Sequence, residues 1–246
     1  MKKLIILSTF IAIALVISAS IPDELTEEYG QTIFSVSDPE YEWSQINTKQ
    51  IKVGFKSQSL QFESKQNNGF AYSVVELPIN VEDNAEFLFG INLKGFKPND
   101  SSKEEKFSKE NKFISKAASK AENVDATNMI NSSFGMIFDY QDIRNYKGLA
   151  ISKKEYQYYM VKDGIVSMVK RGPVKYEGDI FKLIMRRENG GIEFLLNGIE
   201  VCNLRKIKLT SSFFGVFING KGKAEMPSFI MYISEQEDTE QSTSNT

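Results

Sequence analysis

Hydrophobic and polar residues alternate along most of the chain from Thr32 onward. Ile51, Val53 and Phe55, for example, are spaced two apart with Lys52 and Gly54 between them. Period two places every second side chain on one face, so it predicts half-buried β-strands. Further strands are expected at residues 60–62, 70–77, 87–91, 134–140, 148–152, 155–161, 165–170, 179–187, 192–196, 199–204, 213–218 and 224–233.

Short turns separate many of these strands. Asn197 and Gly198 supply the two positive-φ positions of a type I′ turn, which closes a β-hairpin. Asp163 and Gly164 do the same in the hairpin before it. Strands joined by such short turns are antiparallel neighbours, so the chain is predicted to be all-β, with hairpins and meanders.

The amino-terminal segment has the pattern of a signal peptide. Lys2 and Lys3 precede an apolar run over residues 4–17, and the small residues 18–20 follow. The run is shorter than the ~20 residues that span a bilayer as a helix. We therefore expect cleavage near Ser20, no transmembrane segment in the mature chain, and a protein that is secreted or lies in the periplasm or cell envelope.

Two other segments depart from the strand pattern. Residues 97–131 are rich in Lys, Glu, Ser, Asn and Ala, and 103–122 can form a weak amphipathic helix. The segment also carries two glycosylation sequons, at Asn99 and Asn131. Residues 234–246 have no apolar residue to bury and should be disordered. The organisation expected is one domain over 21–233, with an exposed insertion at 97–131.

Composition removes several classes of function. The chain has 30 Lys and Arg against 32 Asp and Glu, a net charge of −2, and loss of Lys2 and Lys3 takes it to −4. A chain with a net negative charge does not attract the negatively charged backbone of a nucleic acid. The chain has no histidine, which excludes Ser-His-Asp and Cys-His mechanisms and imidazole metal sites. Cys202 is the only cysteine, so no disulfide can form within the chain.

Several segments in order resemble a known group of folds. They are Phe134-Gly-Met-Ile-Phe138, Asp142-Ile-Arg-Asn145-Tyr146, the turn Asn197-Gly198, and Phe214-Gly215-Val216. Together, residues 134–233 resemble concanavalin A-like, laminin G-like β-sandwich domains, including the 3-keto-disaccharide hydrolase family and related carbohydrate-binding modules. The resemblance implies an antiparallel jelly-roll β-sandwich, closed by residues 30–96 and interrupted by the insertion.

Three polar residues suggest a ligand or metal site. Asp139, Asp142 and Asn145 lie within one turn after a strand, where their oxygens can bind calcium or a sugar. The alternative is local: Asp142 and Asn145 hydrogen-bond the backbone of their own turn. No other cofactor is expected.

Tyrosines and arginines form the second set of candidates. Tyr140, Tyr146, Tyr156, Tyr158 and Tyr159 can stack on pyranose rings, although about half of the tyrosines in alternating strands face a core. Tyr156 and Tyr158 are two positions apart and so lie on the same face of their strand. Either both face the core or both are available to a ligand.

Arg186 and Arg187 can bind a carboxylated sugar, against the alternative of salt bridges on a strand.

The leading hypothesis is an exported, noncatalytic binding module for a glycan or another extracellular polymer. The alternatives are a glycoside-acting hydrolase that uses carboxylates, and an envelope scaffold that binds a protein through the insertion or the acidic tail. No predicted strand carries the Glu-x-Asp-x-x-Glu arrangement of laminarinase-type enzymes, and the chain has no glycine-rich phosphate loop.

Overall fold

A computed structural model provides the structure of the protein, and it describes residues 32–81, 86–97, 130 and 132–233. The chain divides into two compact units, Met1–Thr32 and Ile33–Thr246. The first lies outside the described residues except for Thr32, so the description that follows concerns the second. The expected signal peptide, the helix at 103–122 and the acidic tail also lie outside the described residues.

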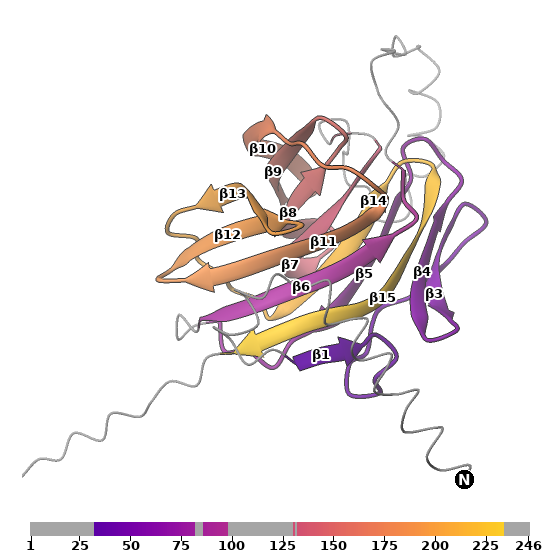
Figure 1. The fold of residues 1–246 in the computed structure, drawn as a ribbon, viewed down its shortest axis with the longest axis horizontal. Helices are drawn as coiled ribbons and strands as arrows, with labels where there is room; N and C mark the ends of the chain where they lie inside the picture. The colour runs from indigo at the N-terminus through magenta and orange to yellow at the C-terminus, as the bar shows by residue number, and fades with distance from the viewer. Residues whose placement is uncertain (1–31, 82–85, 98–129, 131, 234–246) are drawn as a thin grey trace, which may run out of the picture. The chain divides into compact units, whose positions relative to one another are not determined.

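Two antiparallel sheets make up the fold. The larger has nine strands in the order β13-β12-β11-β6-β15-β4-β3-β2, with β1 paired to β15. Its strands are β1 (Thr32–Ser35), β2 (Ile46–Asn47), β3 (Ile51–Lys56), β4 (Ser59–Ser64), β6 (Phe87–Lys94), β11 (Ile180–Glu188), β12 (Gly191–Leu196), β13 (Ile199–Leu204) and β15 (Gly222–Ile233). In Figure 1 this sheet lies in front of the second one.

The smaller sheet has six strands in the order β10-β9-β8-β7-β14-β5. Its strands are β5 (Phe70–Glu76), β7 (Ser133–Asp142), β8 (Asn145–Ile151), β9 (Glu155–Lys162), β10 (Ile165–Pro173) and β14 (Phe213–Asn219). Strand β14 lies between β5 and β7, so segments far apart in sequence become neighbours in the sheet. None of the described residues belongs to a helix that is long and apolar enough to cross a membrane.

The main hydrophobic core fills the space between the two sheets. Phe134 of β7 stacks on Phe181 of β11 with ring centroids 4.3 Å apart, and Phe138 meets Phe194 of β12 at 5.5 Å. Trp43 is 4% exposed and packs on Phe229. Apolar side chains at alternate positions of both sheets thus face each other, as in a sandwich. The predicted all-β, antiparallel jelly-roll β-sandwich is confirmed.

Both predicted hairpins are present. Asn197 and Gly198 have φ of 52° and 82°, and Asp163 and Gly164 have 53° and 82°. These positive values are those that a type I′ turn requires. Strand β8 begins at Asn145, three residues before its expected start, because Asn145 pairs with Asp142 across the preceding turn.

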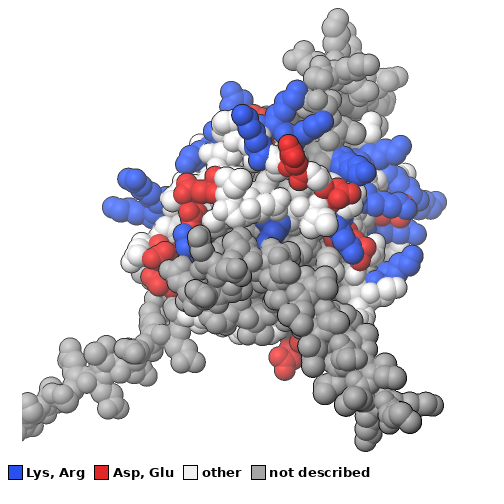
Figure 2. Space-filling view, viewed as in Figure 1, with Lys and Arg blue, Asp and Glu red and all other residues white. Residues whose placement is uncertain are grey.

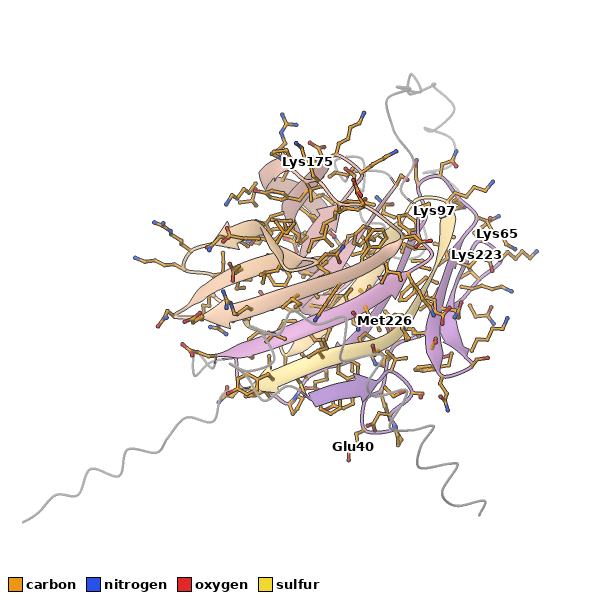
Figure 3. The ribbon with its side chains drawn as sticks, in the orientation of Figure 1. Glu40, Lys65, Lys97, Lys175, Lys223 and Met226 are labelled. Atoms are coloured by element: carbon orange, nitrogen blue, oxygen red, sulfur yellow. The ribbon has the colours of Figure 1, made fainter. Side chains whose placement is uncertain are left out.

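Lysines gather where β3, β4 and the start of β15 meet at one edge of the larger sheet (Figure 2, right). Lys65 and Lys223 lie near each other there (Figure 3), and Lys223 forms an ion pair with Glu63 at 3.4 Å. Lys52 and Lys56 are exposed on β3. Exposed lysines on an edge oppose the addition of further strands, so this edge is protected against edge-to-edge association.

Candidate functional site

A second apolar cluster lies on the side of the six-stranded sheet that faces away from the core. An antiparallel sheet that has one face on the core usually presents polar side chains on the other. Here that other face carries aromatic rings, supported by Val74, Ile137, Ala150, Val161 and Val166. We call these six rings the aromatic face: Phe70, Tyr72, Tyr140, Tyr146, Tyr159 and Phe217.

The aromatic face rests on glycines. A Cβ atom on Gly148 would lie 2.5 Å from the ring of Tyr159. One on Gly135 would lie 1.8 Å from the backbone oxygen of Leu149 and 2.9 Å from the ring of Phe217. A side chain at position 148 would therefore displace the ring above it, and one at position 135 would first collide with the backbone of β8. Glycine in a strand often marks such a close approach.

The six rings form one connected layer. Neighbouring centroids are 4.9 Å apart for Phe70 and Phe217, 5.5 Å for Phe70 and Tyr72, and 6.2 Å for Tyr72 and Tyr140. Tyr146 continues the layer at 6.2 Å from Tyr140 and 6.0 Å from Tyr159. These distances fall within the range of favourable aromatic pairs.

Exposure divides the layer into a rim and a centre. Phe70, Tyr72 and Tyr140 are half-buried, whereas Tyr146 and Tyr159 are 3% and 1% exposed. Among the described residues, the hydroxyls of Tyr146 and Tyr159 have no hydrogen-bond partner of good geometry. Burial raises the pKa of both phenols, so both stay protonated at neutral pH. The two hydroxyls interact with each other, but without the geometry of a good hydrogen bond. Buried hydroxyls that are poorly paired are costly, and a ligand that reached them would relieve that cost.

The tyrosines chosen from sequence separate according to face. Tyr140, Tyr146 and Tyr159 belong to the aromatic face. Tyr156 and Tyr158 lie on the opposite face of β9, in the core between the sheets. Tyr158 stacks on Phe138 at 6.1 Å, and burial raises its pKa to about 12. Tyr156 and Tyr158 therefore both contact core side chains, and neither is available to a ligand on the aromatic face.

Sequence reasoning did not select Phe70, Tyr72 and Phe217. A signal in the sequence was nevertheless available for this face. An aromatic residue that pairs across strands with a glycine has room to lie over that glycine. Phe217 pairs with Gly135, and Tyr159 pairs with Gly148.

Asp139 connects β7 to the loop before β14. It is 6% exposed, and its φ is 52° at an irregularity in the β7–β8 pairing. Its Oδ1 accepts hydrogen bonds from the backbone N–H groups of Thr210 (2.5 Å) and Ser211 (2.9 Å). Its Oδ2 accepts from Lys147 Nζ at 2.5 Å. The carboxylate thus organises a junction between residues 71 positions apart in sequence.

Asp142 and Asn145 have different partners from Asp139. Asp142 Oδ1 accepts from the backbone N–H of Arg144 at 2.7 Å, and Asn145 Nδ2 donates to both Asp142 oxygens at 3.1 Å. Asn145 Oδ1 accepts from the backbone N–H of Asp163 at 3.0 Å. Asp142 thus bonds the backbone of its own turn, as in the local alternative, whereas Asn145 bonds the Asp142 carboxylate and the backbone of a different turn. Across the described ranges, no three His, Cys, Asp or Glu side chains are arranged to hold a metal, and calcium at these residues stays a prediction.

Arg187 lines a pocket of about 720 Å³ at one end of the sandwich. We call it the basic pocket, and its described lining residues are Val81, Arg187, Gly190, Lys206, Ile207, Lys208, Leu209 and Thr210. Arg187 is 2% exposed, and its Nη1 donates to the carbonyl of Val81 at 3.4 Å. Burial lowers the pKa of its guanidinium, and the charge of Asp139 opposes that shift. Arg186 instead forms an ion pair with Glu193 on the neighbouring strand, as the alternative for these arginines described.

Two carboxylates approach each other outside this pocket. Glu193 of β12 and Glu200 of β13 interact, and this contact is the main cause of the raised pKa of Glu200. Glu200 is exposed, and Arg186 already binds Glu193. Neither glutamate lines the basic pocket. A paired acid and base for glycoside cleavage needs a substrate cleft between the two groups, and these two lie on an exposed sheet surface.

Comparisons with known proteins concern the fold. No family model matches the chain, and no curated protein matches its sequence. Among solved structures, it is similar to the carbohydrate-binding module CBM66 from Bacillus subtilis, with 10% identity, coverage of 77% of this chain and 94% of that one, and a TM-score of 0.47. A Bacillus subtilis protein of unknown function with a galectin-like fold has 8% identity, coverage of 83% and 96%, and a TM-score of 0.49. Bacillus licheniformis beta-glucanase has 10% identity, coverage of 83% of this chain and 97% of that one, and a TM-score of 0.47.

The two antiparallel sheets and the core between them define the class of the fold, which is the antiparallel jelly-roll β-sandwich. At identities near 10% and TM-scores below 0.5, these likenesses say nothing about a ligand or a reaction. Since no family model matches, the resemblance to the 3-keto-disaccharide hydrolase family stays an expectation.

Proposed function

We propose that the protein is an exported binding module that holds a glycan on the aromatic face without cleaving it. The observation that carries this proposal is a layer of six rings on the sheet face that points away from the core, with two buried hydroxyls, of Tyr146 and Tyr159, that are poorly paired within the described part of the chain. Export is proposed from the signal-peptide pattern of residues 1–20.

The chemistry of the rim suits a pyranose. The C–H groups on one side of a sugar ring form a flat apolar surface that packs on an aromatic ring, and a phenol adds a hydrogen-bonding group. Phe70, Tyr72 and Tyr140 are half-buried, so their accessible parts border the buried centre of the layer. Burying an apolar sugar face there releases water, and sugar hydroxyls can pair with the hydroxyls of Tyr146 and Tyr159.

Two other functions are less well supported. A hydrolase of the 3-keto-disaccharide type needs general acid and base groups in a substrate pocket. Glu193 and Glu200 are the carboxylate pair described above, and they lie on an exposed surface away from both the aromatic face and the basic pocket. A protein scaffold needs no aromatic layer with poorly paired buried hydroxyls, and it becomes the favoured function if no glycan binds.

A glycan array probed with the purified chain tests the proposal. We expect a selective signal that Tyr72→Ala and Tyr140→Ala each weaken about 10-fold, since truncation removes both the buried apolar area of the ring and about 0.5–1.5 kcal/mol of ring-specific contact. Tyr146→Phe and Tyr159→Phe keep the rings and remove only the hydroxyls, so they separate the polar contribution from the stacking.

Phe55→Ala is the matched control, because Phe55 is an aromatic residue that is 41% exposed on the other sheet. An array without signal, or equal losses in Tyr72→Ala and Phe55→Ala, would rule the aromatic face out as the binding site. Release of a reducing end from a bound oligosaccharide would instead support the hydrolase.

A further inference from the structure

The acidic tail, residues 234–246, begins next to the basic pocket. Strand β15 ends at Ile233, which pairs with Phe87 at the start of β6, and Phe87 pairs in turn with Arg187 near the end of β11. These three strand ends lie together at the left of Figure 1. Neighbouring strands are about 4.8 Å apart, so Ile233 and Arg187 are separated by about 10 Å.

The same row of paired residues leads on to the lysines of the pocket. From Arg187 the row continues through β12 to Leu204 of β13. Lys206 and Lys208 follow Leu204 closely in the chain, and both are exposed. The backbone N–H of Ile207, which lies between them, donates to the carbonyl of the turn before β12 at 3.0 Å. The cations of the pocket therefore lie at the end of the sheet where the tail begins.

The tail and the pocket carry opposite charges. Residues 234–240 include four acids: Glu235, Glu237, Asp238 and Glu240. The described lining of the pocket contains three cationic residues and no carboxylate. One of them, Arg187, is 2% exposed, so its charge is screened by salt less than a surface charge is.

We propose that the acidic tail docks in the basic pocket of its own chain, with its carboxylates against Lys206 and Lys208. The row of paired residues spans about 19 Å from Ile233 to Leu204. Seven extended residues cover about 23 Å, so residues 234–240 are long enough to cross the pocket. Arg187 keeps its contact with Val81 and adds its charge from the wall of the pocket.

The covalent connection makes a weak attraction sufficient. Residues 234–246 have no apolar side chain to bury, so the contact is electrostatic and weakens as salt is added. A tethered segment has an effective concentration in the millimolar range, so it populates the docked state even where a separate peptide would bind poorly. An acidic ligand of the pocket would have to displace the tail. This inference does not depend on the aromatic face.

Amide NMR spectra of the full chain test the docking. The neutral-tail variant replaces the four acids of residues 234–240 by their amides: Glu235→Gln, Glu237→Gln, Asp238→Asn and Glu240→Gln. Relative to wild type, we expect its backbone amide signals to shift at residues 206–208, because the tail no longer contacts the lysines. Salt screens the same attraction, so at about 0.5 M salt the difference should fall about 5-fold or more.

Glu40→Gln with Glu42→Gln is the control for the change in net charge. Both glutamates are exposed in the loop after β1, and neither lines the pocket. This pair of substitutions should leave the signals of residues 206–208 in place.

The reciprocal experiment changes the pocket. Lys206→Asn with Lys208→Gln should release the tail and move the signals of residues 235–240 to the positions that they have in about 0.5 M salt. Asparagine suits position 206, where φ is 56°. Lys52→Gln with Lys56→Gln, exposed on β3 near the other edge of the sheet, is the matched control and should leave the tail signals unchanged.

Concentration separates docking within one chain from binding to another. Wild-type spectra at ~20 µM and ~1 mM should agree, because docking within a chain does not depend on concentration. Tail signals that move with concentration would show binding to a second copy and would overturn the proposal. Changes in the neutral-tail variant that stay confined to residues 233–241 would also overturn it, as would equal effects of the two lysine pairs on the tail.

Discussion

The ring of Tyr159 on β9 lies directly over Gly148 on β8, and a Cβ atom at position 148 would approach the ring and hydroxyl to 2.5 Å. The two residues are cross-strand partners on the face that points away from the core. Glycine at one position thus makes space for an aromatic residue at the other. The aromatic face depends on such pairs, which gives it a direct structural test.

Gly148→Ala should destabilise the protein. The new methyl group displaces the ring of Tyr159, which is 1% exposed and has little room to move. Overpacking of this kind costs about 1–3 kcal/mol in the free energy of unfolding, measurable by urea denaturation. Gly54→Ala is the control, because the nearest atom to its Cβ is the side-chain oxygen of Gln45 at 3.3 Å, which can move. Equal stability of the two variants would mean that Tyr159 is not held against Gly148.

Asp139→Asn should destabilise the fold far more than Asp142→Asn. Asp139 is buried, accepts from two backbone N–H groups, and neutralises Lys147, whereas Asp142 is exposed in its turn. Replacing one partner of a buried ion pair costs about 3–5 kcal/mol, and replacing an exposed carboxylate costs less than about 1 kcal/mol. Thermal and urea unfolding measure both.

Calcium binding is the alternative to a purely structural role for Asp139, Asp142 and Asn145. A site formed by Asp139, Asp142 and Asn145 would make the unfolding temperature rise with calcium concentration, and Asp142→Asn would remove that rise. No rise is the result expected if the hydrogen bonds that all three side chains already form are their whole role.

Glu200→Gln should raise stability at neutral pH. The pKa of Glu200 is raised in the folded protein, chiefly by its contact with Glu193, so ionisation of Glu200 is less favourable in the folded chain than in the unfolded one. Wild type therefore loses stability as pH rises through this pKa, and the variant does not. The gain should be small but present at pH ~7, because the pair is exposed, and vanish near pH ~3, where Glu200 is protonated in both states.

Thermal unfolding over that pH range provides the measurement, with Glu188→Gln as an exposed control. A stability gain that persists at low pH would show that charge repulsion between Glu193 and Glu200 is not its cause.

The basic pocket should prefer an anionic sugar to a neutral one. Arg187, Lys206 and Lys208 are its cationic lining residues among those described, so glucuronate should bind more tightly than glucose and less tightly at high salt. Lys206→Asn and Lys208→Gln together should weaken glucuronate about 10-fold, as measured by calorimetry. Asparagine suits position 206 because Lys206 has a φ of 56°.

Lys52→Gln, an exposed lysine on β3, is the charge-matched control for that experiment. Equal affinity for glucose and glucuronate would exclude charge recognition in the pocket. Arg187→Gln is unsuitable as the main variant, because Arg187 is 2% exposed and its loss would also affect folding.

Local patterns in the sequence were sufficient for strands β3 to β15, the two type I′ hairpins and the shared face of Tyr156 and Tyr158, but not for the short strands β1 and β2. The reason is that these features depend on neighbours within a few residues: period two sets which side chains share a face, and Asn197-Gly198 sets a turn.

Only the tertiary structure decided which face became the interior. Period two is the same for a strand whose tyrosines face the core and for one whose tyrosines face away, so Tyr156 and Tyr159 could not be told apart before the sheets packed. The placement of β14 between β5 and β7 decided that Phe217 meets Gly135, and the bond from Thr210 to Asp139 joins residues 71 positions apart. Such contacts arise from pairing between distant strands, and no local pattern in the chain encodes them.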